Sequence, residues 1–188
     1  MTVLPEFLQA AAVAVHKHRL QRRQDAEASP YSNHPFAVAA FLAGEGGVTD
    51  GLPLVAAVLH DTLEDTETTP AELATVFGPV IRDLVQAVTD DTTLLTAARK
   101  TRQAAGAARL TDRATLLRIA DQIAHVRDGT HHSPAPWDRT RRRAYLDWTA
   151  QVVAGCRGVN PSLDATYDRV LREGRAVLAS QPLPTPDV

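Results

Sequence analysis

The chain has 188 residues, which is enough to bury a full hydrophobic core, and a single domain is the default expectation. Its formal net charge of −2 and hydrophobic content of 44% give no sign of a nucleic-acid or membrane partner. The single cysteine, Cys156, excludes an internal disulfide and a Cys-based zinc site and favours a reducing compartment. The longest apolar stretch, residues 52–59, is too short to span a bilayer, and no signal-peptide pattern occurs. We therefore expect a cytoplasmic protein.

Almost every segment carries helix start and stop signals, and no useful strand alternation occurs. Asp50, Thr69 and Thr111 are suited to cap helices, and Asn160-Pro161 opens the last one. The expected helices cover residues 5–23, 35–43, 51–59, 70–78, 79–88, 96–109, 112–128, 137–156 and 161–180. The prediction is a single all-α domain over residues 1–180, followed by a disordered tail at 181–188 with three prolines.

The apolar run at residues 54–59 leads directly into a His-Asp doublet, His60-Asp61, and two more acids follow at Glu64 and Asp65. The run has the spacing of a buried helix. Ionisable groups at the end of such a helix are costly to bury unpaired, and a divalent metal would compensate them. A helix end with ordinary solvated acids is the favoured explanation of an isolated doublet, so the rest of the chain has to decide.

Two further residues fit the metal interpretation. His34 stands before Pro35 at a helix start, and Asp121 is a charge flanked by apolar residues on a helix that otherwise has a core pattern. Two histidines and two carboxylates from three helices can surround one metal and leave positions open for water. The plain alternatives are an ordinary helix-start histidine and an ion pair between Asp121 and Arg118.

With these residues in order, the sequence resembles the HD superfamily of metal-dependent phosphohydrolases. Within it, the match is to the small alarmone hydrolases, the stand-alone relatives of the hydrolase half of the Rel/Spo proteins. The resemblance runs over about residues 12–159, and its most specific part is the His-Asp-x-x-Glu-Asp form of residues 60–65. The other matching stretches are residues 30–35, 77–78, 88–91 and 119–121. The resemblance implies the HD-domain helical bundle.

The resemblance also implies a site and a reaction. The implied metal, usually Mn²⁺, is bound by His34, His60, Asp61 and Asp121. Glu64 and Asp65 then act on the attacking water, which carboxylates three and four residues beyond Asp61 can reach if the segment stays helical. The implied reaction converts guanosine 3′-diphosphate 5′-(di)phosphate, ppGpp or pppGpp, to GDP or GTP and pyrophosphate. A solvated, acidic helix end is the plain alternative for Glu64 and Asp65.

A polyanionic nucleotide needs cations, and basic residues cluster at residues 18–23, 99–109 and 139–143. Arginine suits bidentate phosphate contacts, although a solvated helix face explains any single arginine as well. By resemblance, the expected substrate contacts are Arg23, Tyr31, Arg141 and Tyr145. Tyr31 could stack on the base or bond a phosphate, whereas Tyr145 could equally be a core aromatic residue.

Four positions depart from the family pattern. A lysine is expected at Gln24, a basic residue at Gln122, an asparagine at His125 and a glycine at Ala28. The predicted metal ligands and acids are intact, whereas the predicted substrate-binding residues differ. His125 lies four residues beyond Asp121, so it faces either the pocket or the surface, and the sequence leaves both open.

Three functions follow from this pattern. Alarmone hydrolysis leads, because the ligands and acids occur in family order. A phosphatase acting on another phosphorylated nucleotide, such as NADPH, is the alternative that the altered positions motivate. A catalytically idle alarmone-binding module is the third, but binding alone would not require Glu64 and Asp65. In each case the expected partner is a small-molecule nucleotide, and nothing in the sequence fixes an oligomeric state.

Overall fold

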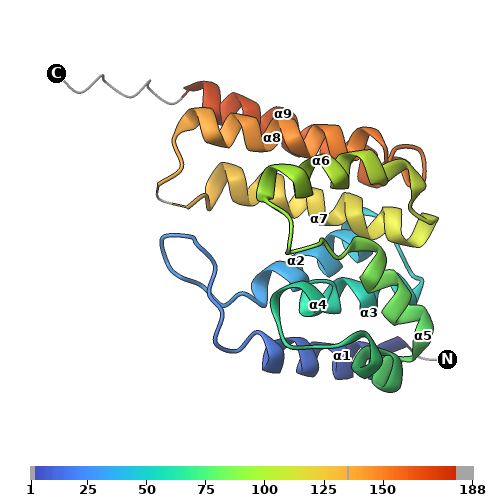
Figure 1. The fold of residues 1–188 in the computed structure, drawn as a ribbon. Coiled ribbons are helices and arrows are strands. Elements are labelled where there is room, and N and C mark those ends of the chain that lie inside the picture. Colours follow the sequence, from blue (N-terminus) through green and yellow to red (C-terminus); the bar gives the residue numbers. More distant parts are fainter. Residues whose placement is uncertain (1–2, 135, 181–188) are drawn as a thin grey trace.

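The computed structural model describes residues 3–134 and 136–180, and within these ranges the chain is all-α, as predicted (Figure 1). The elements are α1 (Val3–Lys17), α2 (Asn33–Ala40), η1 (Phe41–Glu45), α3 (Gly51–Leu59), α4 (Thr62–Asp65), α5 (Pro70–Val88), α6 (Thr96–Gly106), η2 (Ala107–Arg109), α7 (Asp112–His131), α8 (Arg139–Ala154) and α9 (Pro161–Ser180). Within the described residues, the β-structure consists of one isolated bridge between Arg22 and Pro30. The predicted disordered tail, 181–188, lies outside the described residues.

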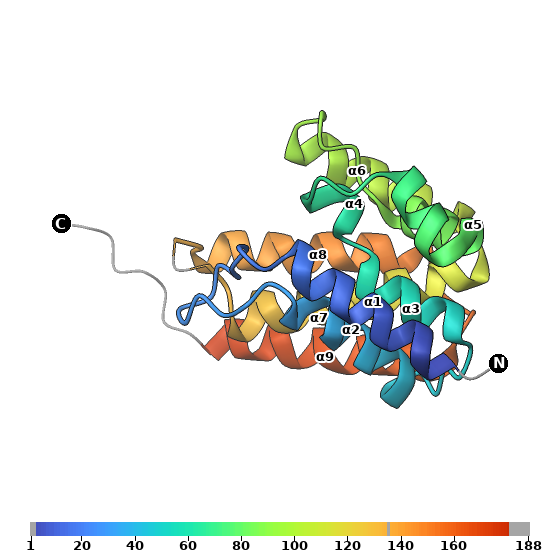
Figure 2. The same ribbon diagram turned by 90° about the horizontal axis from the view of Figure 1, so that it is seen from below.

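The helices form layers around α7. In Figure 1, α1 lies at one side, α2 and α3 come next, α7 occupies the middle, and α8 and α9 cover the other side. Figure 2 shows the same bundle from below, with α5 and α6 extending away from it. Helix α7 contacts α2, α3, α5, α8 and α9, so most of its residues are buried. Two of these buried residues, Arg118 and Asp121, are charged. A charged side chain in the protein interior needs a partner of opposite charge.

The predicted helix starts are confirmed by their caps. The Asp50 carboxylate accepts the Leu52 N–H at 3.1 Å, and the Thr69 hydroxyl accepts the Glu72 N–H at 3.2 Å. Thr111 and Asn160 cap α7 and α9 in the same way. Each cap satisfies a backbone donor that the helix itself leaves free, so the local sequence fixes these boundaries.

The first predicted helix was too long, because α1 ends at Lys17 and not near residue 23. His18 is buried and stacks on Tyr31, with ring centroids 4.9 Å apart. The following segment then pairs with a later loop, and the Arg23 N–H donates to the Ser29 carbonyl at 2.8 Å. The Arg23 N–H therefore donates to the carbonyl of a later loop residue, whereas in a longer helix it would donate to a carbonyl one turn earlier.

Helix α2 begins at Asn33, two residues earlier than predicted, so His34 lies inside its first turn, and the chain continues through the π-helical η1. The predicted break at Gly78 is confirmed, because α5 consists of two helical segments joined by a sharp kink at Gly78, whose backbone is not helical (φ 83°, ψ 165°). No helix within the described residues has the length and apolar character needed to cross a membrane.

Candidate metal centre and nucleotide site

Three helices carry the predicted metal ligands to one point. The apolar α3 is buried along most of its length and ends at His60, which is its C-cap. The short α4 follows at once and keeps Glu64 and Asp65 in a helical turn. Helix α2 supplies His34 from its first turn, and α7 supplies Asp121 from its buried middle. Ligands far apart in sequence therefore meet because α2, α3 and α7 pack together.

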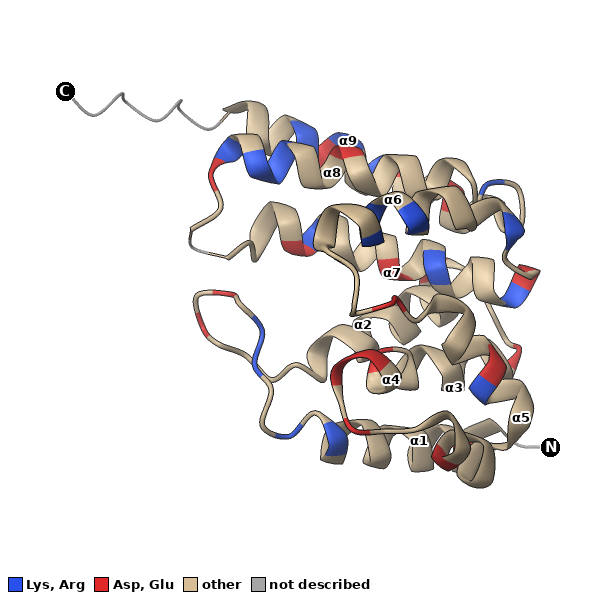
Figure 3. Cartoon of the chain, in the orientation of Figure 1, with Lys and Arg blue, Asp and Glu red and all other residues tan. Residues whose placement is uncertain are grey.

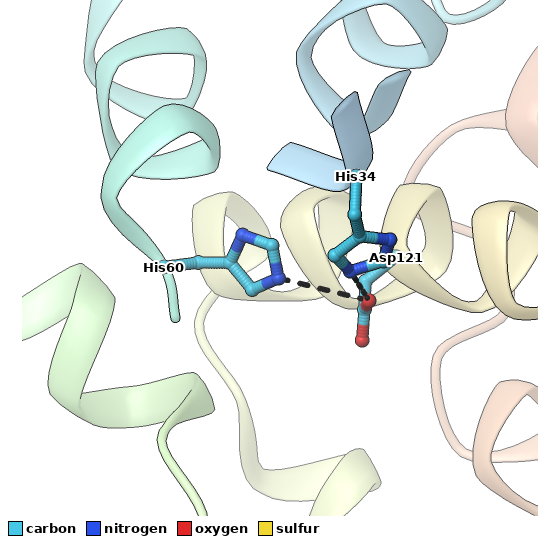
Figure 4. A group of neighbouring side chains, drawn as sticks. All are labelled: His34, His60 and Asp121. Atoms are coloured by element: carbon cyan, nitrogen blue, oxygen red, sulfur yellow. Dashed lines mark ion pairs between the residues drawn. The ribbon is translucent and has the colours of Figure 1, made fainter. Parts of the chain in front are cut away.

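The cluster is centred on one oxygen of Asp121. Its Oδ1 lies 3.3 Å from the Nε2 atom of His34 and 3.7 Å from that of His60 (Figure 4). Asp61 joins them, with Oδ1 at 3.1 Å from His60 Nε2 and Oδ2 at 3.7 Å from His34 Nε2. All four residues predicted to bind metal are thus brought together.

The donor atoms fit a divalent cation. Ligand atoms of His34, His60 and Asp121 lie within 4.8 Å of one another. His60 Nε2 and Asp121 Oδ1 are buried and have no hydrogen-bond partner, which is costly unless a ligand satisfies them. His60 Nδ1 lies 2.8 Å from the Ala57 carbonyl, to which it donates, so its Nε2 presents a lone pair to the cluster. A mixed nitrogen and oxygen set of this kind suits manganese, iron, cobalt or zinc.

The electrostatics of the cluster also favour a cation. Burial opposes ionisation of Asp121, but the surrounding His125, His34 and His60 rings outweigh it and lower the pKa of the carboxyl. Burial also lowers the pKa of His34, but its contact with Asp121 and the charge of Asp61 outweigh burial, so the net pKa is raised. Because a ligating imidazole must be neutral, protonation of His34 competes with metal binding.

The two predicted acids are held next to the cluster. Glu64 accepts the Asp90 N–H at 3.0 Å and pairs with Arg99 at 3.1 Å. Burial raises the pKa of Glu64 to about 7, although the hydrogen bond from Asp90 acts in the opposite direction. Its side chain is only 20% exposed, so it is not a solvated helix end.

Asp65 remains exposed, but the structure gives its carboxylate a partner. The Tyr31 hydroxyl lies 2.8 Å from Asp65 Oδ2 and 2.7 Å from Asp61 Oδ2. Burial and the charge of Asp61 raise the pKa of Asp65. Tyr31 thus connects a predicted ligand to a predicted catalytic acid, a role that its sequence position did not suggest.

The predicted substrate contacts gather at an adjoining cavity of about 230 Å³. It is lined by Arg23, Tyr31 and Tyr145, together with Gln24 and Trp137. Arg23 forms an ion pair with Asp128 and lies 5.7 Å over the Tyr31 ring. The fourth predicted contact, Arg141, is exposed, and its guanidinium stacks 4.7 Å over Trp137.

Sequence reasoning missed Trp137, Lys100 and Trp148 as individual site residues. The Lys100 ammonium lies 4.7 Å over the Tyr145 ring and 4.6 Å over the Trp148 ring. Burial and the neighbouring Arg141 lower the pKa of Lys100. Figure 3 shows acidic residues on α4 and basic residues on α6 and α8. The only sequence signal for Lys100 was its membership of a basic cluster.

His125 belongs to the site. Its ring stacks on that of His34, with centroids 5.3 Å apart and planes at 8°, and its Nε2 lies 3.4 Å from Asp121 Oδ1. Burial lowers the pKa of His125 to about 4. Arg118, the alternative partner of Asp121, lies 3.5 Å from Oδ2 and leaves Oδ1 to the imidazoles.

Comparisons with known proteins identify the family. The model of the HD domain family matches residues 10–154, so the chain carries an HD domain. Mouse guanosine-3′,5′-bis(diphosphate) 3′-pyrophosphohydrolase MESH1 is 44% identical over 89% of this chain and 94% of its own length. The human MESH1 protein is 42% identical over the same shares of the two chains. The solved structure of a metazoan ortholog of SpoT that hydrolyses ppGpp superposes with a TM-score of 0.87, at 37% identity over 92% of this chain and 96% of that one.

The chain therefore belongs to the MESH1 family of HD-domain proteins. The resemblance to small alarmone hydrolases and the predicted HD-domain bundle are both confirmed.

Proposed function

We propose that this chain is a metal-dependent guanosine-3′,5′-bis(diphosphate) 3′-pyrophosphohydrolase, which converts ppGpp and pppGpp to GDP and GTP with release of pyrophosphate. The observation that carries the proposal is the convergence of His34, His60, Asp61 and Asp121 beside the two acids of α4. The activity that names the mouse and human relatives supports it.

The four clustered residues would hold the metal, for which we propose Mn²⁺. When bound, the metal would act as a Lewis acid that polarises a phosphate and lowers the pKa of a water molecule. His60 and His34 present nitrogen donors, and Asp61 and Asp121 compensate the charge in a buried setting. Tyr31, by donating to Asp61, orients that carboxylate.

Glu64 and Asp65 divide the proton transfers between them. Glu64 takes a proton from the water that attacks the phosphorus bound to the 3′ oxygen. The bond from that phosphorus to the 3′ oxygen breaks, pyrophosphate leaves, and Asp65 returns a proton to the ribose oxygen. The pKa of Glu64, raised to about 7, suits a group that exchanges protons near neutral pH, and the pKa of Asp65 is also raised.

The adjoining cavity is suited to the nucleoside. Rings of Tyr31, Trp137 and Tyr145 offer stacking surfaces, and Arg23 lies among them. Arg141 and Lys100 stand at the aromatic rings and provide positive charge for phosphates. In this arrangement the aromatic cavity binds the base, and the cations and the metal centre bind the phosphates.

A second candidate keeps the chemistry and changes the substrate. Gln24 lines the cavity and His125 lies at the metal centre, both where the family pattern has other residues. Another phosphorylated nucleotide, such as NADPH, is therefore the competing substrate.

The experiment is pyrophosphate release from ppGpp by the manganese-loaded protein, beside phosphate release from NADPH. The His60→Ala, Asp61→Ala double variant should lose turnover of either substrate. Asp168 lies on α9 and forms an exposed ion pair with Arg157. The Asp168→Asn variant is the matched control and should retain turnover. Faster hydrolysis of NADPH would favour the second candidate. Alarmone binding without turnover under several metals would instead indicate an idle binding module.

A further inference from the structure

Gln122 and His125 are neighbours on α7 that both depart from the family pattern, and they contact each other at the metal centre. We infer that Gln122 fixes the tautomer of His125 with the proton on Nε2. His125 is then a hydrogen-bond donor to a phosphate bound at the metal centre, and not a metal ligand. The phosphate part of this inference rests on the proposed function.

Three imidazoles surround one carboxylate oxygen. The Nε2 atoms of His34, His125 and His60 lie 3.3, 3.4 and 3.7 Å from Asp121 Oδ1. Distance alone would make all three candidate ligands. The three rings differ in the group that Nδ1, the other ring nitrogen, contacts. That group decides which of the two nitrogens carries the proton.

His34 and His60 each have an acceptor behind the ring. His60 Nδ1 lies 2.8 Å from the Ala57 carbonyl, which can only accept. His34 Nδ1 forms no hydrogen bond, but the negative Asp128 Oδ2 lies 3.8 Å from it. The hydrogen bond to Ala57 places the proton of His60 on Nδ1, and the charge of Asp128 favours the same position in His34, so that Nε2 of each ring offers its lone pair to a metal.

His125 has a donor behind the ring. The Gln122 amide nitrogen lies 3.2 Å from Asp121 Oδ2, and an ionised carboxylate only accepts. The reverse orientation of the amide would set two oxygens against each other. The same nitrogen lies 3.3 Å from His125 Nδ1, so its second proton needs a lone pair there. Gln122 is completely buried, so bulk water cannot replace this contact.

The proton of the neutral His125 ring is therefore on Nε2, which faces the cluster. Asp121 Oδ1 has no hydrogen-bond partner that satisfies standard geometry, so this N–H remains available to a phosphate oxygen. Stacking on His34 at 5.3 Å and the Trp148 ring at 5.8 Å hold the imidazole in place. An asparagine amide at this position would offer the same N–H chemistry, whereas an alanine would offer none.

Histidine tautomers are directly measurable by long-range ¹H–¹⁵N correlation NMR on protein labelled with ¹⁵N-histidine. Zn²⁺ is the probe, because it is diamagnetic, and His125→Asn identifies the signals of His125. We expect His125 to keep its proton on Nε2 in both metal-free and zinc-loaded protein, while the Nε2 signals of His34 and His60 shift with zinc. A His125 proton on Nδ1, or a zinc-induced shift typical of a metal-bound nitrogen at His125 Nε2, would overturn the inference.

Variants separate the donor role from a ligand role. His60→Ala removes a ligand and should weaken zinc affinity by well over about a hundred-fold, whereas His125→Ala should weaken it by no more than about 10- to 100-fold, the range typical of a group that contacts the ligands from outside the coordination sphere. Gln122→Met removes the amide donor, and the His125 signals should then report a mixture of tautomers. An unchanged single tautomer in that variant would show that Gln122 does not set it.

Kinetics test the phosphate contact. For ppGpp, kcat/KM should fall roughly ten-fold or more in His125→Ala, and His125→Asn should recover part of the loss. Equal losses in the two variants would overturn the donor role. If wild-type protein turns over no ppGpp while the NMR result holds, the proposed function fails and the tautomer assignment stands.

Discussion

Glu64 is the predicted proton acceptor of the reaction, and burial on α4 brings its ionisation close to neutral pH. Its pKa is raised to about 7, so below that pH the carboxyl is protonated and cannot accept a proton from water. We expect kcat to rise as the pH increases through about 7. Glu64→Gln should lower kcat by roughly 10²- to 10⁴-fold and abolish this rise.

The measurement is kcat against pH at saturating metal, with bound metal quantified at each pH. Metal occupancy is the necessary control, because protonation of His34 competes with the metal at low pH. A kcat that falls through the same pH range would assign Glu64 the opposite role, that of proton donor.

Ala28 lies in the loop before α2 with a positive φ of 47°, which is a left-handed conformation that costs an L-residue energy. The family pattern has glycine at this position. Ala28→Gly should raise the free energy of unfolding by about 1 kcal/mol, because glycine adopts this conformation without strain.

Urea denaturation would measure the change. Ala26→Gly, in the same loop at ordinary φ, is the matched control and should destabilise by about 0.4–1 kcal/mol through added freedom of the unfolded chain. Destabilisation by both variants to the same extent would show that Ala28 carries no strain.

At the scale of elements, the kink in α5 depends on Gly78. Its φ of 83° and ψ of 165° lie in a region that is essentially limited to glycine, and a Cβ there would meet no atom within 4 Å. Gly78→Ala should therefore destabilise through backbone strain alone, by about 1–3 kcal/mol. Thermal or urea unfolding provides the measurement.

Gly106, at the end of α6, is the matched control. Its φ of −84° is ordinary, and a Cβ there would also meet nothing within 4 Å. Gly106→Ala should be neutral or stabilise by up to about 1 kcal/mol. If both glycines respond alike, the kink is not held by the conformational preference of Gly78.

At the scale of the whole molecule, the metal centre connects α2, α3 and α7 across the middle of the bundle. A metal that binds only the folded chain should raise Tm, and at a concentration 100 times its Kd it adds about 2.7 kcal/mol. Chelation with EDTA should reverse the shift. The His60→Ala, Asp61→Ala variant should show no shift, and an equal shift in that variant would place the bound metal elsewhere.

The size of this stabilisation should depend on pH in a definite direction. The folded-state pKa of His34 is raised in the metal-free protein, so the stability gained from its proton is present at low pH and lost as pH rises through that pKa. The metal replaces that proton. The metal-induced rise in Tm should thus be larger at about pH 7.5 than at about pH 5.5, as a thermal melt at each pH would report.

The sequence by itself determined the features that depend on residues close together in the chain. Capping by Asp50, Thr69 and Thr111 marked the helices, because a cap acts on the backbone two or three residues away. The apolar run before His60 fixed a buried helix, and Asp61, Glu64 and Asp65 followed at helical spacing. The helices and the acidic segment after His60 were predictable for this reason, whereas the full ligand set and the HD-domain fold were expected from the resemblance to a known family.

Only the tertiary structure decided features that depend on partners distant in sequence. Helix α1 ends early because His18 stacks on Tyr31 from the next segment. Lys100 joins the site because α6 packs against α8 and brings the Lys100 ammonium to Tyr145. His125 faces the cluster, and not solvent, because it packs on His34 of α2. A sequence pattern shows which residue types recur along a helix, but burial and proton position depend on atoms that other helices contribute.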